Sequence, residues 1–261
     1  MEDLSYSYDG SRKALDGVSL KIRRGEFIGI LGQNGCGKTT LVKHFNRLLL
    51  PSSGRVLVFG RDTREWKTSQ LGKRIGYVFQ NPDHQIFANT VQEEVAFGPR
   101  NFGLSEDEIA HRVRGALQEV GLEGYEDKDP FSLTKGERQK VAIASVLASR
   151  PEVIILDEPT TGLDYWGQRG VMDLLKVLNE KGHTIIIITH CMWAAAEYCH
   201  RCVVMADGRV LKDGPTREVF RDEGVLAEAS LRAPAITQLG NLLGVTPLSV
   251  QEMRDCLCSS T

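Results

Sequence analysis

The chain has 261 residues, of which 41% are hydrophobic and 25% are charged, and its formal net charge is −2. This length and composition are typical of a globular protein that buries a sizeable core, either as one large α/β domain or as a domain with an appendage. The near-neutral charge argues against nucleic-acid binding, no apolar run reaches the roughly 18 residues of a membrane-spanning helix, and the first residues do not resemble a signal peptide.

Short apolar runs alternate with helical patterns along the chain, which predicts an α/β fold. Runs without polar alternation are typical of strands that are buried on both faces of a parallel sheet. We expect six such strands, at residues 27–31, 55–60, 74–79, 153–158, 184–190 and 202–208.

The strand pattern gives way to helical patterns between residues 82 and 150. Ser105 and Glu108 form a capping-box signature at the start of a helix, and Gly121 is placed to end it. The apolar residues of this helix recur at helical spacing, at Ile109, Val113, Leu117 and Val120. A second helix is expected from about residue 136 to 148, so a helical segment interrupts the α/β core.

The segment GQNGCGKTT at residues 32–40 fits the phosphate-loop pattern G-x-x-x-x-G-K-[ST], between a predicted strand and a helical pattern. Its glycines let backbone N–H groups close around phosphate oxygens. We expect Lys38 to reach the β- and γ-phosphates of a nucleoside triphosphate and Thr39 to bind Mg²⁺. The expected nucleotide contacts are Gly32, Asn34, Gly35, Cys36, Gly37, Lys38, Thr39 and Thr40.

Two acidic residues, Asp157 and Glu158, end the buried strand at 153–158. Side chains alternate along a strand, so we expect Asp157 to hold Mg²⁺ and Glu158 to act as the general base for an attacking water. A solvated surface pair is the alternative, and the four apolar residues before the acids argue against it. His190 ends another strand, at the edge where parallel sheets bind ligands, and is an expected γ-phosphate contact.

These motifs occur in an order that resembles the ATP-binding cassette (ABC) ATPases over about residues 4–215. The phosphate loop is followed by Gln80, LTKGE at 133–137, ILDEPTTGLD at 155–164 and His190. The resemblance implies a P-loop NTPase core with a mainly parallel sheet, an inserted α-helical subdomain at about 82–150 and an N-terminal antiparallel β portion. It also implies roles for Gln80 (Q-loop, Mg²⁺), Asp164 (D-loop), His190 (switch histidine) and Tyr8 (stacking on adenine).

In that family two ATPase subunits form a head-to-tail dimer, and the signature of one subunit closes over the ATP of the other. The resemblance therefore implies a second ATPase subunit as partner, contacted by Thr134, Lys135, Gly136 and Glu137. This signature departs from the family's L-S-G-G-Q. Thr134 keeps a hydroxyl, whereas Lys135 replaces a glycine. Because lysine tolerates a positive φ poorly, we expect either an ordinary backbone conformation or strain here.

The segment QNPDHQIFANTVQEEVAFGP at residues 80–99 is similar to the corresponding segment of one branch of this family. That branch comprises the ATPase subunits of energy-coupling-factor (ECF) importers of vitamins and transition-metal ions. This resemblance implies a peripheral protein at the cytoplasmic face of the cell membrane, bound to a transmembrane coupling subunit and a substrate-binding membrane subunit. The expected partner contacts are Asp83, Gln85, Ile86 and Phe87. Ordinary core packing is the alternative for Ile86 and Phe87.

Residues 216–261 are expected to form a helical extension after an ATPase domain at 1–215. An apolar stripe at Ile236, Leu239 and Leu243 could cover its own domain or contact another subunit, and Ser249 with Glu252 predicts a capped last helix. The leading interpretation is a motor subunit that uses Mg-ATP-driven dimer closure for micronutrient uptake. The alternatives are the ATPase of a conventional ABC importer and, less favoured, a soluble ABC ATPase without a transport role.

Overall fold

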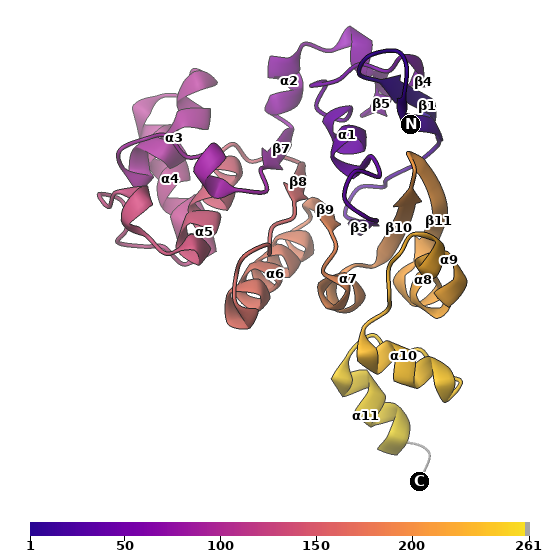
Figure 1. The fold of residues 1–261 in the computed structure, drawn as a ribbon. Coiled ribbons are helices and arrows are strands. Elements are labelled where there is room, and N and C mark those ends of the chain that lie inside the picture. Colours follow the sequence, from indigo (N-terminus) through magenta and orange to yellow (C-terminus); the bar gives the residue numbers. More distant parts are fainter. Residues whose placement is uncertain (259–261) are drawn as a thin grey trace. The chain divides into compact units, whose positions relative to one another are not determined.

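The computed structural model describes residues 1–258, and its contacts divide the chain into two units, residues 1–66 with 186–261 and residues 67–185 (Figure 1). The second unit contains the whole of the segment at 82–150 that was expected to be helical.

The first unit is built around β3 (Phe27–Leu31), all five residues of which are buried. Strand β10 (Arg201–Ala206) pairs with β3 in parallel, from Arg201 opposite Ile28 to Val204 opposite Leu31. The order of strands is β11-β10-β3-β9, with β11 (Arg209–Pro215) antiparallel to β10, and the boundary between the units falls within β9 (Thr184–Thr189). The predicted parallel strands at 27–31 and 202–208 are thus confirmed.

A small antiparallel sheet precedes this core. It has the order β2-β1-β4 and is formed by β1 (Glu2–Ser7), β2 (Lys13–Val18) and β4 (Ser53–Arg55). The stretch 55–60, predicted as one strand buried on both faces, holds only the end of β4 and a two-residue strand, and it alternates between buried Val56 and Val58 and exposed neighbours, as a half-buried strand does. The chain then reverses through Phe59 (φ 52°), and β5 (Leu57–Val58) pairs with β6 (Arg61–Asp62), followed by η1 (Thr63–Glu65).

The remaining elements of the first unit are helices. They are α1 (Lys38–Lys43), α7 (Met192–Tyr198), α8 (Thr216–Arg221), α9 (Glu223–Glu228), α10 (Ala235–Leu242) and α11 (Val250–Cys258). The predicted cap of the last helix is present in part. Ser249 Oγ accepts from the Glu252 backbone N–H at 3.1 Å, but the Glu252 carboxylate accepts from the N–H of Leu248. Arg217 of α8 pairs with Glu252 at 2.9 Å, which ties α8 to α11.

The second unit holds two parallel strands, β7 (Ile75–Val78) and β8 (Val153–Asp157), which pair from Ile75 opposite Val153 to Val78 opposite Leu156. Helix α2 (Thr68–Gly72) precedes β7, and α6 (Tyr165–Glu180) follows β8. The predicted strands at 74–79 and 153–158 are confirmed, the first one residue shorter at each end and the second one residue shorter at its carboxyl end.

The insertion between β7 and β8 is helical, as predicted. It contains η2 (Pro82–His84), α3 (Val91–Asn101), α4 (Glu106–Val120), η3 (Pro130–Ser132) and α5 (Lys135–Leu147). Ser105 caps α4 by accepting from the Glu108 N–H, and Gly121 ends the helix in the left-handed conformation at φ 68°. The predicted apolar face of α4 is buried. Within residues 1–258, no helix combines the length and the hydropathy that crossing a membrane would require.

Candidate functional site

The phosphate loop joins β3 to α1 and is shaped by its glycines. Gly35 and Gly37 have φ values of 82° and 105°, and a Cβ on Gly37 would lie 2.6 Å from the Ala14 carbonyl oxygen. A side chain at Gly32 would likewise clash with the backbone of Met205. Side chains are therefore excluded from the loop at these positions, and its backbone can approach a phosphate closely.

Lys38 is buried, and its ammonium donates to the carbonyl oxygens of Gly32 at 2.7 Å and Gln33 at 2.8 Å. The side chain therefore folds back over its own loop. The ammonium group therefore lies beside the backbone of the loop, where its positive charge can bind phosphate oxygens. Thr39 and Thr40 follow on α1, and Thr40 is buried.

A cavity of about 520 Å³ lies beside the same loop in the first unit. Its volume falls in the range of roughly 300–1,000 Å³ that small-molecule sites occupy. The lining residues are Tyr8, Asp9, Arg12, Lys13, Ala14, Gly35, Asp207 and Gly208. The Tyr8 hydroxyl is hydrogen-bonded to Thr40 Oγ1 at 3.1 Å, and its ring is 63% exposed. The predicted adenine-stacking residue and the phosphate loop thus contribute to one cavity.

Arg12 and Lys13 in this cavity are candidate nucleotide contacts that the sequence analysis missed. They come four and five residues after Tyr8, in the β1–β2 connection and at the start of β2. In the sequence, two adjacent basic residues so soon after Tyr8 could have indicated that they contact the same nucleotide. His190, which belongs to the same unit, directly follows β9 and is exposed, as its expected role at a strand end requires.

The acid pair lies in the second unit, and its two residues differ in backbone conformation. Asp157 is the last residue of β8, is buried and accepts a hydrogen bond from the Tyr77 hydroxyl at 3.0 Å. Glu158 lies beyond the strand with φ 49°, a left-handed conformation that costs a non-glycine residue free energy. Its Oε2 accepts from Thr161 Oγ1 at 3.4 Å. The change of conformation, and not strand alternation alone, makes the two carboxylates point differently.

The exposed residue Gln80 follows β7 and opens the segment that was expected to contact a partner. Asn81 caps η2 by accepting from the Asp83 N–H, and Pro82 is the first residue of this short helix. The Asp83 carboxylate pairs with Arg138 of α5 at 2.9 Å.

Gln85 and Ile86 serve the chain's own packing. The Gln85 amide donates to Ala142 O and Ser145 Oγ of α5 and accepts from the Phe79 N–H. Ile86 is only 3% exposed, so core packing, the alternative reading, applies to it. Phe87 is 60% exposed and meets the exposed ring of Phe97 edge-on at 4.7 Å.

The signature residues form the start of α5. Thr134 is the N-cap, and a complete capping box joins it to Glu137: Glu137 Oε2 accepts from Thr134 N at 2.8 Å and Oγ1 at 2.7 Å, while Thr134 Oγ1 accepts from Glu137 N at 3.3 Å. Lys135 and Gly136 lie in the first helical turn without a positive φ, so Lys135 introduces no backbone strain.

The Lys135 ammonium lies against Gly162, where a Cβ would clash with it. Gly162 belongs to the D-loop segment that ends at Asp164. Asp164 is exposed and caps α6 by accepting from the Gly167 N–H at 2.7 Å. In this unit the departure at Lys135 therefore brings the signature and the D-loop into contact.

Comparisons with known proteins agree with this geometry. The family model described as "ABC transporter" matches residues 15–161. A putative ABC transporter ATP-binding protein of Caldanaerobacter subterraneus subsp. tengcongensis is 57% identical over 98% of this chain, but the chain spans only 45% of that relative's length. An energy-coupling factor transporter ATP-binding protein of Methanocaldococcus jannaschii is 47% identical, covering 93% of this chain and 88% of the relative.

Solved structures of ABC transporter ATPases also match this chain. The structure of cbiO1 from Clostridium perfringens, described as part of the ABC transporter complex cbiONQ, matches with a TM-score of 0.81 and 42% identity. The match covers 94% of this chain and 97% of that one.

Proposed function

The chain belongs to the ABC transporter family, to ATP-binding subunits of the energy-coupling-factor type, and we propose that it is the ATP-hydrolysing motor of a micronutrient importer. The transported substrate is a vitamin or a transition-metal ion in this proposal, in keeping with the branch that the sequence resembles.

ATP binds to the first unit in this proposal. Tyr8 stacks on the adenine, and Arg12 and Lys13 add positive charge to the cavity that Tyr8 lines. The loop from Gly32 to Gly37 receives the phosphates on its backbone N–H groups, and Lys38 leaves the carbonyl oxygens it now contacts for the β- and γ-phosphates. The exclusion of side chains from the loop supports this assignment.

Mg²⁺ is the metal that this site would use, and oxygen donors suit it. We assign the Thr39 hydroxyl, the Gln80 side chain and the Asp157 carboxylate to it. The buried position of Asp157 and its hydrogen bond from Tyr77 support this assignment, because the hydroxyl orients the carboxylate. The bound metal would neutralise charge on the phosphates during transfer.

Glu158 is the general base in this proposal and takes a proton from the attacking water, while His190 contacts the γ-phosphate. Glu158 is buried, held in a costly backbone conformation and oriented by Thr161, as expected for a side chain that must be placed accurately. Hydrolysis is then coupled to the opening of a dimer in which Thr134, Lys135, Gly136 and Glu137 of one subunit, with the D-loop Asp164, face the ATP of the other.

One observation carries the transport assignment beyond ATP hydrolysis. The segment after Gln80 is anchored to α5 by Gln85 and Asp83, yet it presents Phe87 and Phe97 to solvent as an aromatic pair. A rigidly held, exposed apolar pair is typical of a protein–protein contact. We assign it to the transmembrane coupling subunit, which would hold this chain at the cytoplasmic face of the membrane.

The experiment that tests the function is co-purification from native membranes with a tagged Glu158→Gln variant in Mg-ATP. This variant keeps the shape of the base but cannot accept the proton, so ATP should stay bound and the closed complex should accumulate. Integral membrane proteins, including a substrate-binding subunit, should co-purify. Recovery of soluble proteins, nucleic acid or ribosomes alone would overturn the transport assignment and leave the ATPase chemistry intact.

A further inference from the structure

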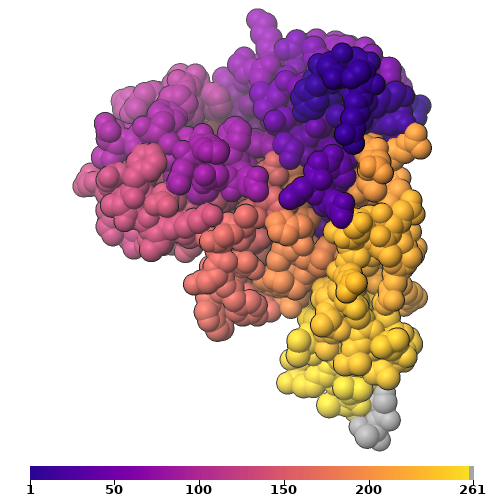
Figure 2. All heavy atoms as spheres, viewed as in Figure 1, coloured from indigo at the N-terminus to yellow at the C-terminus, as the bar shows by residue number. Residues whose placement is uncertain are grey.

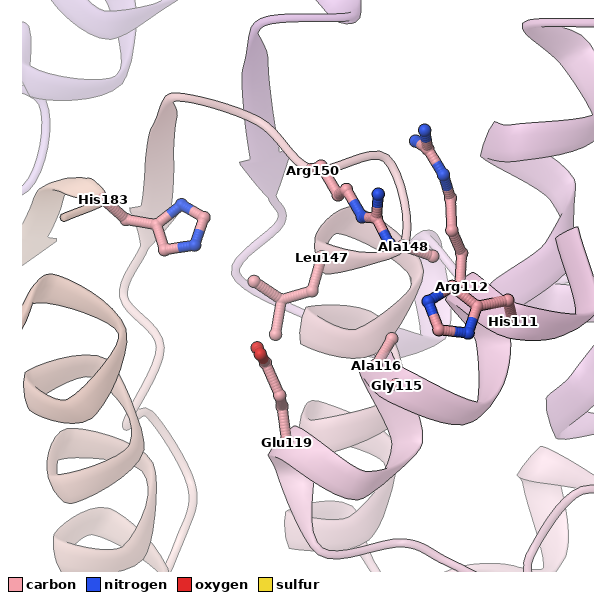
Figure 3. Close-up of a pocket in the computed structure, with 9 residues that line it drawn as sticks. All are labelled: His111, Arg112, Gly115, Ala116, Glu119, Leu147, Ala148, Arg150 and His183. Carbon is pink, nitrogen blue, oxygen red and sulfur yellow. The ribbon is translucent and has the colours of Figure 1, made fainter. Parts of the chain in front are cut away.

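A second, smaller cavity of about 130 Å³ lies at the surface of the second unit, outside the candidate nucleotide and partner sites described above (Figure 3). It is lined by one face of α4, the end of α5 with the residues after it, and the turn between α6 and β9. The lining residues are His111, Arg112, Gly115, Ala116, Glu119, Leu147, Ala148, Arg150 and His183. Figure 3 shows Glu119 and Leu147 between His183 on one side and the two arginines on the other.

The two arginines of the cavity share a single carboxylate. Arg112 Nε donates to Glu108 Oε1 at 2.7 Å, and Arg150 Nη1 lies 3.5 Å from the same oxygen. The pKa of Glu108 is lowered, chiefly by the hydrogen bond from Arg112. Two guanidinium groups against one carboxylate leave an excess positive charge, and most of their N–H donors have no hydrogen bond within residues 1–258. Two guanidinium groups, each with several N–H donors in one plane, are suited to binding an oxyanion.

The cavity also contains acceptors. His183 Nδ1 donates to the Pro151 carbonyl at 2.8 Å, which leaves Nε2 as an acceptor in the neutral ring. Glu119 Oε1 is paired with Lys181 at 3.0 Å, which offsets its charge, and Oε2 has no hydrogen bond within the described part of the chain. Arginine donors combined with carboxylate and imidazole acceptors match an oxyanion that itself carries a hydrogen, such as monohydrogen phosphate.

One lining residue of the cavity is a glycine inside a helix. Gly115 lies in the middle of α4 without a positive φ, and a Cβ built on it would have no atom within 4 Å. A glycine at such a position destabilises a helix by about 0.5–1 kcal/mol relative to alanine. Neither backbone conformation nor packing requires glycine at this exposed position, and a long side chain there would extend into the cavity.

We propose that this cavity is a binding site for one protonated, phosphate-sized oxyanion. Its volume admits a single tetrahedral anion and is well below the roughly 300–1,000 Å³ of sites for larger ligands. The anion would be held by Arg112 and Arg150, and its O–H would donate to Glu119 or His183. It would link α4 to the end of α5, the helix whose other end carries Thr134 and the signature.

Calorimetric titration of the full chain with inorganic phosphate tests this proposal. The chain is first saturated with Mg²⁺ and a non-hydrolysable ATP analogue, which occupies the phosphate loop through its γ-position. One phosphate should then bind, and sulfate, which carries no hydrogen near neutral pH, should bind at least about tenfold more weakly. Absence of phosphate binding, or equal affinity for the two anions, would overturn the proposal.

Three variants test which residues phosphate binding requires. Arg112→Gln with Arg150→Gln should weaken phosphate binding at least about tenfold, whereas Arg114→Gln, an exposed arginine on α4 outside the cavity, should leave it unchanged. Gly115→Leu keeps every charge but fills the space, and should abolish binding while circular dichroism shows an intact helix content. Unchanged binding in Gly115→Leu would place the anion elsewhere.

The same phosphoryl chemistry occurs in lipid headgroups, so vesicles of phosphatidic acid in phosphatidylcholine serve as a separate probe. A free anion predicts binding of inorganic phosphate and no dependence of vesicle binding on Arg112 and Arg150. Binding to the vesicles that needs both arginines, without binding of free phosphate, would refute the free-anion site.

Discussion

Asp157 and Glu158 are neighbours in the sequence, but their side chains are held by different means. A hydrogen bond from Tyr77 orients Asp157, and a left-handed backbone at φ 49° orients Glu158. Burial raises the pKa of Tyr77, and the nearby Asp157 carboxylate adds to the effect, so this hydroxyl remains a donor throughout the working pH range.

The first prediction concerns this hydroxyl. Tyr77→Phe should keep the edge-on contact with Phe79 at 5.1 Å but remove the donor to Asp157. A hydrogen bond to a charged group contributes about 1.5–3 kcal/mol, so we expect kcat for ATP hydrolysis to fall about tenfold or more and the Mg²⁺ concentration for half-maximal activity to rise. ATP binding without Mg²⁺ should be unchanged. Steady-state assays across Mg²⁺ concentrations measure both, and a wild-type rate would exclude Tyr77 as a positioning residue.

At the scale of single residues, the sequence could predict features whose residues are close together along the chain. The phosphate loop was readable because Gly32, Gly37 and Lys38 occur within seven residues, between a strand and a helix that the structure also has. Tyr77 was not readable, because its partner Asp157 is 80 positions away and the two meet only once β7 pairs with β8. The roles of these residues in catalysis stay predictions that kinetics must test.

At the scale of elements, α5 depends on its first turn. Thr134 and Glu137 each satisfy an N–H of the other, and the Tyr125 hydroxyl adds a third donor to Glu137 at 3.0 Å. The departures from the family signature at Thr134 and Glu137 are therefore consistent with each other: together they form a capping box, a pattern that the sequence analysis identified before two other helices but not here.

The second prediction follows from this cap. Thr134→Ala should lower the free energy of unfolding by about 0.5–2 kcal/mol, whereas Thr134→Ser, which keeps the hydroxyl, should retain most of it. Thermal or urea denaturation of the two variants measures the difference. Equal stability of Thr134→Ala and the wild type would show that the cap does not stabilise α5 in solution.

The cap also predicts a dependence on pH. Hydrogen bonds from Thr134, and then from Tyr125, lower the pKa of Glu137 below its usual 4.5. The ionised form is therefore favoured in the folded state, so this contribution is present above pH 4.5 and is lost as the pH falls through the lowered pKa. Because Glu137 is only partly buried, the effect should be small. The difference in stability between wild type and Thr134→Ala should narrow in that acidic range, and a constant difference would contradict the assignment.

The segment after Gln80 shows how a short element combines anchoring with contact. The sequence allowed Ile86 and Phe87 the same two possible roles, partner contact or core packing, and did not separate the two residues. Ile86 is buried and Phe87 exposed, because Gln85 is bonded to α5 and fixes which way its neighbours point. Periodicity cannot resolve this, since the segment belongs to no regular element that would set a period.

The third prediction uses that distinction. Phe87→Asp should leave ATP binding and thermal stability close to wild type, because the side chain is exposed, but should abolish co-purification of membrane subunits. Ile86→Asp should instead destabilise the protein by several kcal/mol, because it buries a charge without a partner. Denaturation curves beside membrane pull-downs separate the two effects. Retention of membrane partners by Phe87→Asp would exclude the Phe87–Phe97 pair as the contact.

At the scale of the whole chain, the order of its motifs predicted the family, since each motif alone is weak and six in order are specific. The placement of the apolar residues of the C-terminal extension could not be predicted in the same way. A stripe with helical spacing is expected both of a helix that covers its own core and of one that contacts another subunit. Helical spacing does not tell which of these apolar side chains are exposed, and the structure does.

Helices α10 and α11 present several large apolar side chains to solvent, whereas other apolar residues of the extension, such as Phe220 and Met253, are buried. Leu242 is 84% exposed and Val250 69%, and the same helices also expose Leu239, Leu243 and Leu257. In Figure 2 the yellow atoms of α10 and α11 lie beyond the orange atoms of α8 and α9, to which Arg217 and Arg221 tie them. Polar contacts therefore attach α10 and α11 to α8, and the exposed leucines of α10 and α11 are left for another surface. We expect that surface to be the second ATPase subunit.

The last prediction tests this expectation. Leu242→Glu with Val250→Glu should weaken association of ATPase subunits at least about tenfold, because two charges would be buried on contact. Ala227→Glu, which places the same charge at an exposed position of α9, should not. Sedimentation velocity over a range of protein concentrations, with and without Mg-ATP, measures the association. If the two variants and the wild type associate alike, the exposed leucines do not form the subunit contact, and dimerisation would then rest on the ATP-facing residues alone.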